Sequence, residues 1–133
     1  MKIAHLTIWS SDIDKLADFY TRFFDGRKGQ RYHNPKKSFS SYFISFEGGC
    51  RLEIMHRANI PESTTNPMNQ AIGITHFIFD LETEAAVNQK TEELRLVGYQ
   101  VVDGPRKTGD GYYESVALDP EDNRLELACV AGS

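Results

Sequence analysis

The sequence is poor in the features that mark several classes of protein. Its 133 residues include only two cysteines, Cys50 and Cys129, and neither belongs to a CxxC motif. Two such cysteines do not make a disulfide framework, and we expect both to be buried as small apolar side chains. No apolar run approaches the length of a membrane span, and the opening residues turn polar too quickly for a signal peptide. We therefore expect a cytoplasmic protein that does not bind membranes.

The sequence also has no excess of basic residues. Fifteen lysines and arginines stand against nineteen acidic residues, which gives a net charge of −4, and the basic residues of segment 27–37 are dispersed. This balance gives no indication of nucleic acid binding or of binding to anionic membranes. With 40% hydrophobic and 26% charged residues, the composition is typical of a globular protein, and the length suits one domain, residues 1–133.

The first part of the chain, about residues 1–57, predicts a strand, a helix and three further strands. Residues 3–9 alternate between two faces, as a half-buried strand does. Ser11 and Asp14 make a capping-box-like start for the helix that follows, and Asp25-Gly26 ends it. The three strands are expected near residues 28–33, 39–46 and 51–56, with Gly48-Gly49 as the hairpin turn between the last two.

The second part, about residues 71–133, repeats this order after a polar linker at about 58–70 that carries Pro61 and Pro67. Thr83 is a plausible cap for a helix whose apolar stripe includes Val87, Leu94 and Val97, and Gly98 ends it. The strands are expected at 74–80, near 100–102, at 112–118 and at 124–130. The sequence thus predicts an α+β fold of two βαβββ modules.

A His–Glu pair occurs in each module at nearly the same spacing. His5 precedes Glu53 by 48 positions, and His76 precedes Glu126 by 50. In each of these strands the apolar residues alternate with the His or the Glu, so the two sets lie on opposite faces. If the helices cover the apolar face, all four polar side chains project from the other face, and a two-fold arrangement of the modules would bring them together.

Two imidazoles and two carboxylates suit a divalent metal such as Zn, Ni, Mn, Fe or Co. Because no thiolate belongs to the set, a closed structural zinc site is disfavoured. Four protein ligands leave two octahedral positions for water or substrate oxygens, which favours catalysis. His33 and His56 have no counterparts in the other module, and we interpret them as surface or rim residues.

The chain resembles the vicinal oxygen chelate superfamily, in particular glyoxalase I-like (lactoylglutathione lyase-related) proteins. The resemblance covers nearly the whole chain and rests on His5, on DKLADFYTRFF, LEIM and GITHFIFDL, and most specifically on LDPEDNRLELA. It implies that the modules form a curved, incomplete barrel around a metal site, commonly in a homodimer. It also implies that His5, Glu53, His76 and Glu126 occupy the metal positions of glyoxalase I, with Zn or Ni as the expected ion.

The resemblance further implies a small substrate that chelates the metal through neighbouring oxygens. The metal would stabilise an enediolate-like intermediate, and Glu126 or Glu53 would serve as the base. Where bacterial glyoxalase I carries an Arg that binds the glutathione carboxylate, this sequence has Trp9, which favours a hydrophobic or aromatic substrate over a glutathione adduct. Four cations are candidates to replace that Arg: Arg51, Arg57, Arg106 and Lys107. Residues 104–113 form either a lid that contacts the substrate or a plain hairpin connection.

Three other functions occur on the same fold. An extradiol-type dioxygenase uses two His and one Glu on Fe(II), and a fosfomycin-resistance type transferase also uses three ligands, so Glu53 counts against both. A metal-free drug-binding protein of the bleomycin-resistance type would have no need of the four ligand residues. The leading interpretation is therefore a metal-dependent lyase or isomerase.

Overall fold

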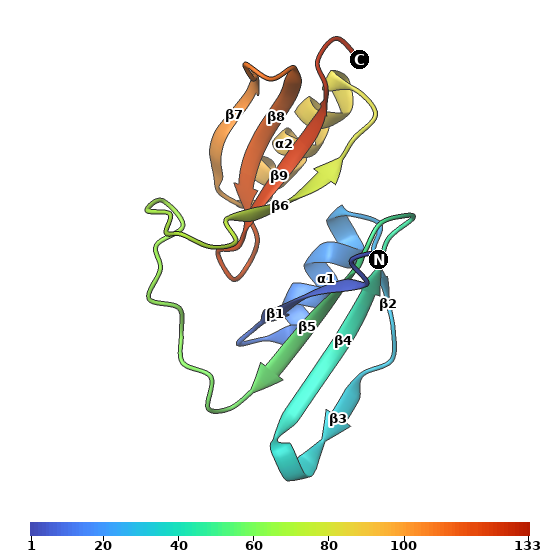
Figure 1. Ribbon diagram of the computed structural model, residues 1–133, viewed down its shortest axis with the longest axis vertical. Helices are drawn as coiled ribbons and strands as arrows, with labels where there is room; N and C mark the ends of the chain where they lie inside the picture. Colours follow the sequence, from blue (N-terminus) through green and yellow to red (C-terminus); the bar gives the residue numbers. More distant parts are fainter. The chain divides into compact units, whose positions relative to one another are not determined.

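The computed structural model describes all 133 residues, which divide into two compact units, residues 1–63 (unit 1) and residues 64–133 (unit 2). Each unit holds one mixed sheet and one long helix that packs against it (Figure 1). The fold class predicted from the sequence, α+β with two βαβββ modules, is therefore confirmed. No helix is both long and apolar enough to cross a membrane.

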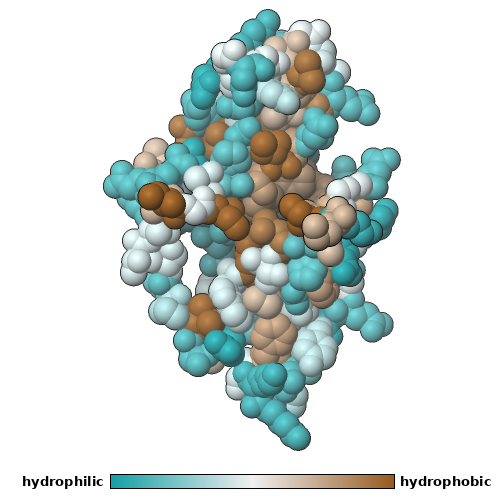
Figure 2. Space-filling view, viewed as in Figure 1, coloured by the Kyte–Doolittle hydropathy of each residue, from teal (hydrophilic) through white to brown (hydrophobic).

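Unit 1 contains a five-stranded sheet in which parallel β1 and β5 lie side by side, β4 follows β5, and β2 and β3 both pair with β4. Its elements are β1 (His5–Trp9), α1 (Ile13–Phe23), β2 (Arg27–Lys28), β3 (Tyr32–Asn34), the 3₁₀ helix η1 (Pro35–Lys37), β4 (Phe39–Ser45) and β5 (Arg51–Arg57). The lower tip of this unit, around η1, is hydrophilic (Figure 2).

The single strand predicted at 28–33 is two short strands in the structure. Lys28 pairs with Ile44 and Tyr32 pairs with Ser41, so four steps along one strand match three along β4. An extra residue of this kind interrupts the hydrogen-bond ladder, as a β-bulge does. The sequence pattern does not reveal the extra residue, because residues 28–33 are polar on both faces.

Unit 2 contains a four-stranded sheet in the order β6-β9-β8-β7, with β6 parallel to β9. Its elements are β6 (His76–Asp80), α2 (Glu84–Leu96), β7 (Val101–Lys107), β8 (Tyr112–Leu118) and β9 (Arg124–Val130). Strand β7 is longer than the predicted 100–102 because register shifts absorb Gly104 and Pro105 within it. The segment at 104–113 is therefore the end of β7, a hairpin connection and the first two residues of β8.

Each helix begins at a side chain that accepts a hydrogen bond from a backbone N–H group. Asp12, and not the predicted Ser11, is the N-cap of α1, where its carboxylate accepts the N–H of Lys15 at 3.0 Å. The carboxylate accepts a stronger hydrogen bond than a hydroxyl would and also favours the positive end of the helix dipole. Thr83 caps α2 as predicted, through a 3.1 Å bond from the N–H of Ala86 to its Oγ1.

Most of the core of each unit lies between its helix and the helix-facing side of its sheet. In unit 1, Leu16 and Tyr20 of α1 are buried together with Ile44 and Ile54 of the sheet, and the hydroxyl of Tyr42 donates to Asp14 of the helix at 2.8 Å. This contact shows that the even-numbered residues of β4 and β5 face α1. The odd-numbered residues, Glu53 among them, lie on the face that α1 leaves uncovered.

In unit 2 the corresponding contact joins Thr91 of α2 to Ser115 of β8, with 2.5 Å between the two hydroxyl oxygens and no exposure of either side chain. Leu125, Leu127 and Cys129 are buried on the same face of the sheet. Two predictions were wrong. Val97 is 47% exposed because it follows the last turn of α2, and Cys50 is exposed because it lies in the turn before β5.

Candidate metal centre

The first His–Glu pair joins the two parallel strands of unit 1. His5 on β1 lies opposite Arg51 of β5, so Glu53 is two residues further along β5 and opposite Thr7. The Nε2 atom of His5 and the Oε2 atom of Glu53 are 3.6 Å apart, and the Thr7 hydroxyl donates to the same carboxylate oxygen at 3.3 Å. Both side chains remain partly open to solvent, with 39% and 16% of their surface exposed.

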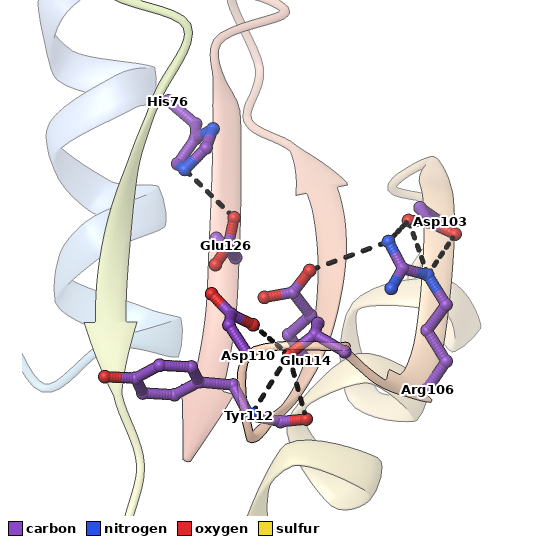
Figure 3. A network of polar contacts seen from close by, with 8 residues as sticks. His76, Asp103, Arg106, Asp110, Tyr112, Glu114 and Glu126 are labelled. Atoms are coloured by element: carbon purple, nitrogen blue, oxygen red, sulfur yellow. Dashed lines mark hydrogen bonds and ion pairs between the residues drawn. The ribbon is translucent and has the colours of Figure 1, made fainter. Parts of the chain in front are cut away.

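The second pair has the same construction in unit 2. His76 on β6 lies opposite Arg124 of β9, and Glu126 is again two residues beyond that arginine. Figure 3 shows the imidazole and the carboxylate pointing toward each other, with 2.9 Å between Nε2 and Oε2. The Nδ1 atom of His76 lies 2.9 Å from the hydroxyl of Thr75, which helps to fix the orientation of the ring.

Both pairs therefore lie on the sheet face that the helix of their own unit leaves uncovered, as strand alternation predicts. The structure brings His5 to Glu53 and His76 to Glu126. Within neither unit do three or more potential ligands gather around a common point. Each unit thus offers one imidazole nitrogen and one carboxylate oxygen, a donor combination that fits a borderline divalent cation.

Glu114 of β8 is a site residue that the sequence did not indicate. It lies two residues before Val116, the cross-strand partner of Glu126, and so shares a face with Glu126. Burial, and then the hydrogen bond and charge of Glu126, raises the pKa of Glu114 to about 7. Arg106 opposes this effect, since its Nη2 atom lies 3.6 Å from Glu114 Oε1 (Figure 3).

Arg106 is held mainly by Asp103. Its Nη2 donates to Asp103 Oδ2 at 2.7 Å, and this pairing holds the pKa of Asp103 below its usual range. The backbone bends between the two residues at Gly104, whose φ of +74° and close approach to the carbonyl oxygen of Glu114 leave no room for a Cβ atom. The Nζ atom of Lys107 lies 3.7 Å from Oε1 of Glu84. Both cations of segment 104–113 therefore have carboxylate partners in unit 2.

Arg51 and Arg57, the other two candidate cations, contact aromatic rings instead of carboxylates. The guanidinium carbon of Arg51 is 4.3 Å from the ring centre of Phe43, and that of Arg57 is 5.4 Å from the ring centre of Trp9. Phe43 also meets the His5 ring edge-on, with 5.4 Å between ring centres. Phe43 and Arg51 therefore lie beside the His–Glu pair of unit 1, whereas Arg57 and Trp9 contact each other further along β5 and β1.

The two remaining histidines lie away from the pairs. His33 is exposed on β3 and contacts the hydroxyl of Ser40 through Nδ1 at 2.8 Å. His56 is half-buried, and its Nδ1 lies 3.0 Å from the carbonyl oxygen of Ser10. His56 is an even-numbered residue of β5 and therefore points to the helix side, opposite to Glu53.

The chain has two βαβββ units, and each carries a His–Glu pair on the sheet face that its helix leaves uncovered. It is therefore an α+β protein of the paired-module class. The sequence matches the family model of the Glyoxalase/Bleomycin resistance protein/Dioxygenase superfamily over residues 2–127, and the chain belongs to this superfamily. The resemblance noted from the sequence is thereby confirmed.

Individual relatives agree with this assignment. The uncharacterized protein YqjT of Bacillus subtilis is 27% identical over 126 residues, which cover 92% of this chain and 94% of the relative. A glyoxylase/bleomycin resistance protein/dioxygenase domain from Frankia sp. EAN1pec superposes with a TM-score of 0.80 at 15% identity over 98% of both chains. The trypanothione-dependent glyoxalase I of Leishmania major gives 0.75 at 16% identity, over 96% of this chain and 85% of that one. These two structures support the fold.

Proposed function

We propose that this chain acts as one domain, a metal-dependent lyase or isomerase of the glyoxalase I type. Its substrate would be a small molecule with two neighbouring oxygens. One divalent metal ion, with Zn or Ni preferred over Mn, Co or Fe, would be held by His5, Glu53, His76 and Glu126. The observation that supports this proposal is the repetition of one His–Glu pair in the same strand register in both units.

The donor set fits such an ion because it offers two imidazoles and two carboxylates, all on partly accessible side chains. A bound cation would supply Lewis-acid stabilisation for the negative charge that develops on a substrate oxygen. One of the two glutamates would carry a proton between neighbouring substrate carbons, which a carboxylate does when it lies within hydrogen-bond reach of both. Glu53 and Glu126 are the two candidates.

Three features of the chain determine how the substrate is oriented. Thr7 donates to Glu53 and so restrains that carboxylate, and Thr75 restrains the His76 ring. Phe43 lies against the His5 ring, and Trp9 adds aromatic surface further along β1. We further expect a homodimer in solution, which sedimentation would detect as twice the 15.1 kDa chain mass.

The test is metal analysis of the purified, Zn- or Ni-loaded protein and of single variants. We expect one ion per chain in the wild type and a loss of affinity of more than about 100-fold in His5→Ala and in Glu126→Ala, since even supporting residues around metal sites cost 10- to 100-fold. His33→Ala is the matched control, because it removes an exposed histidine outside both pairs.

The proposal fails if the loaded wild type holds no stoichiometric metal, or if the two ligand variants bind as tightly as His33→Ala. A preference for Fe(II) together with oxygen consumption on catechols would instead identify a dioxygenase. Metal-independent binding of a small molecule without turnover would identify a drug-binding protein.

A further inference from the structure

We propose that the uncovered sheet face of unit 1 binds a planar aromatic carboxylate. Its ring would lie against Trp9 and Phe39, and its carboxylate would pair with Arg57. As a substrate subsite this assignment rests on the function proposed above and names the substrate class for that site. The binding itself needs no metal ion.

Aromatic side chains cluster at one end of this face. The ring centres of Trp9 and Phe39 are 6.4 Å apart at an interplanar angle of 85°, and Tyr32 lies 6.0 Å from Phe39. Trp9 is 40% exposed and Tyr32 is 55% exposed, while Phe39 is partly exposed. The rings therefore contact one another and still present surface on which a flat ligand can stack.

Arg57 supplies the positive charge at the same place. It is the cross-strand partner of Phe39, and its guanidinium lies over the Trp9 ring. In contrast to Arg106, which Asp103 neutralises, Arg57 lies in no ion pair. A guanidinium held over an aromatic ring keeps donors free for a carboxylate, which it binds in a bidentate geometry.

Strand geometry connects this cluster to the candidate metal ligands. Glu53, Met55 and Arg57 follow one another on the same face of β5, so Glu53 and Arg57 are separated by four residues, or about 13 Å of strand. A ligand with two oxygens near Glu53 and an aromatic carboxylate near Arg57 would span that distance. An anionic ligand also suits the overall charge of unit 1, which has ten basic and seven acidic residues.

The experiment uses the full chain after removal of metal with a chelator. The measured affinity then reports ligand binding at the subsite and not at the metal centre. Trp9 is the only tryptophan, and its indole N–H gives a single NMR cross-peak that reports binding directly. The probes are benzoate, benzamide as the neutral counterpart and cyclohexanecarboxylate as the non-aromatic one. We expect benzoate to bind about fivefold more tightly than either. Equal affinity for benzoate and either of the other probes would overturn the assignment.

Two variants locate the site while leaving the reporter in place. Arg57→Gln should abolish the preference for benzoate over benzamide, and Phe39→Leu should reduce the affinity for benzoate about fivefold. Arg22→Gln is the matched control, because Arg22 also lies over a ring, that of Phe23 at 4.9 Å, but on helix α1. A preference that survives Arg57→Gln, or that is lost equally in Arg22→Gln, would contradict the proposal. Loss of metal binding in the ligand variants leaves this result unchanged, so the two hypotheses fail separately.

Discussion

The two units carry the same His–Glu pair in the same register and surround it with different chemistry. In unit 1 the residue four positions after the histidine is Trp9, and the residue four after the glutamate is Arg57. The corresponding positions in unit 2 are Asp80 and Val130. Glu114 of unit 2, which lies beside Glu126, corresponds to the buried Ser41 of unit 1.

The net charge follows the same division. Residues 1–63 contain ten basic and seven acidic residues, whereas residues 64–133 contain five basic and twelve acidic residues. The comparison shows that the repeat keeps the backbone register and the donor pair while the neighbouring residues on the same face diverge. We therefore propose that unit 1 recognises the substrate, and we expect the shifted proton equilibrium of the metal-free protein to lie in unit 2, where two carboxyl groups meet.

The largest effect that would test this division concerns glutathione adducts. Because Trp9 offers no charge to a glutathione carboxylate, we expect the methylglyoxal–glutathione hemithioacetal to be a poor substrate, with kcat/KM below the ordinary enzyme range of about 10⁴ M⁻¹s⁻¹ and above. Steady-state kinetics of the Zn- and Ni-loaded enzyme measure this. Turnover within the ordinary range would show that unit 1 does recognise a glutathione adduct.

The next effect concerns the pH dependence of stability in the metal-free protein. The pKa of Glu114 is raised from 4.5 to about 7, so the folded state retains a proton that the unfolded state releases as the pH rises between these values. Stability therefore falls with rising pH across this window, by on the order of 3 kcal/mol at full effect. Glu114→Gln should remove this loss.

Urea unfolding at pH 4.5 and pH 8 measures the effect as a difference between wild type and variant. Glu92→Gln is the matched control, since Glu92 is an exposed residue of α2 that pairs with Arg95. If wild type and Glu114→Gln lose the same stability between the two pH values, unit 2 does not hold the shifted carboxyl group.

A smaller effect tests how the helices are attached to the sheets. Helix α1 packs on unit 1 mainly through large apolar side chains, whereas α2 adds the fully buried Thr91–Ser115 contact to Val87 and Leu94. The Thr91 hydroxyl donates to the carbonyl oxygen of Val87 at 2.7 Å, so Ser115 donates to Thr91. Thr91→Val should cost about 1–3 kcal/mol, because it leaves the Ser115 hydroxyl buried without a partner.

The double variant Thr91→Val/Ser115→Ala should recover part of this loss, since removal of both partners leaves no unsatisfied group. Chemical denaturation of the two single variants and the double variant measures the coupling. Strict additivity of the two single losses would mean that the contact does not contribute as described.

The smallest effect concerns the helix caps, which are equivalent in the two units. Asp12→Ala and Thr83→Ala should each reduce stability by about 1 kcal/mol, the usual cost of losing an N-cap side chain. Ser11→Ala should have little effect, because Asp12 is the residue that accepts the Lys15 N–H. Thermal unfolding of the three variants decides the point, and a larger loss in Ser11→Ala than in Asp12→Ala would reverse our assignment of the cap.

The alternation of apolar and polar residues along the strands predicted much of the fold and the two residues of each His–Glu pair. Strands β8 and β9 begin and end at the predicted residues, where turn residues bound runs that are buried over most of their length. The same alternation placed Glu53 and Glu126 on the uncovered faces. Periodicity is informative here because one face of each sheet packs on a helix.

The remaining features depend on contacts between strands that spacing does not encode. Strand β7 continues through Gly104-Pro105, a dipeptide typical of turns, because register shifts against β8 accommodate it. Glu114 becomes a neighbour of Glu126 only through the β8–β9 register, and Arg57 becomes a neighbour of Trp9 only through the β1–β5 pairing. A single sequence does not specify either register in advance.

X-ray absorption spectroscopy of the Ni-loaded protein measures whether the two His–Glu pairs hold one ion together. We expect one nickel per chain, with two imidazole ligands in its first coordination shell and none lost in His33→Ala. His5→Ala and His76→Ala should each weaken nickel binding sharply. Two nickel ions per chain with one imidazole each, or a single ion that is insensitive to His5→Ala, would show that the two pairs do not share an ion.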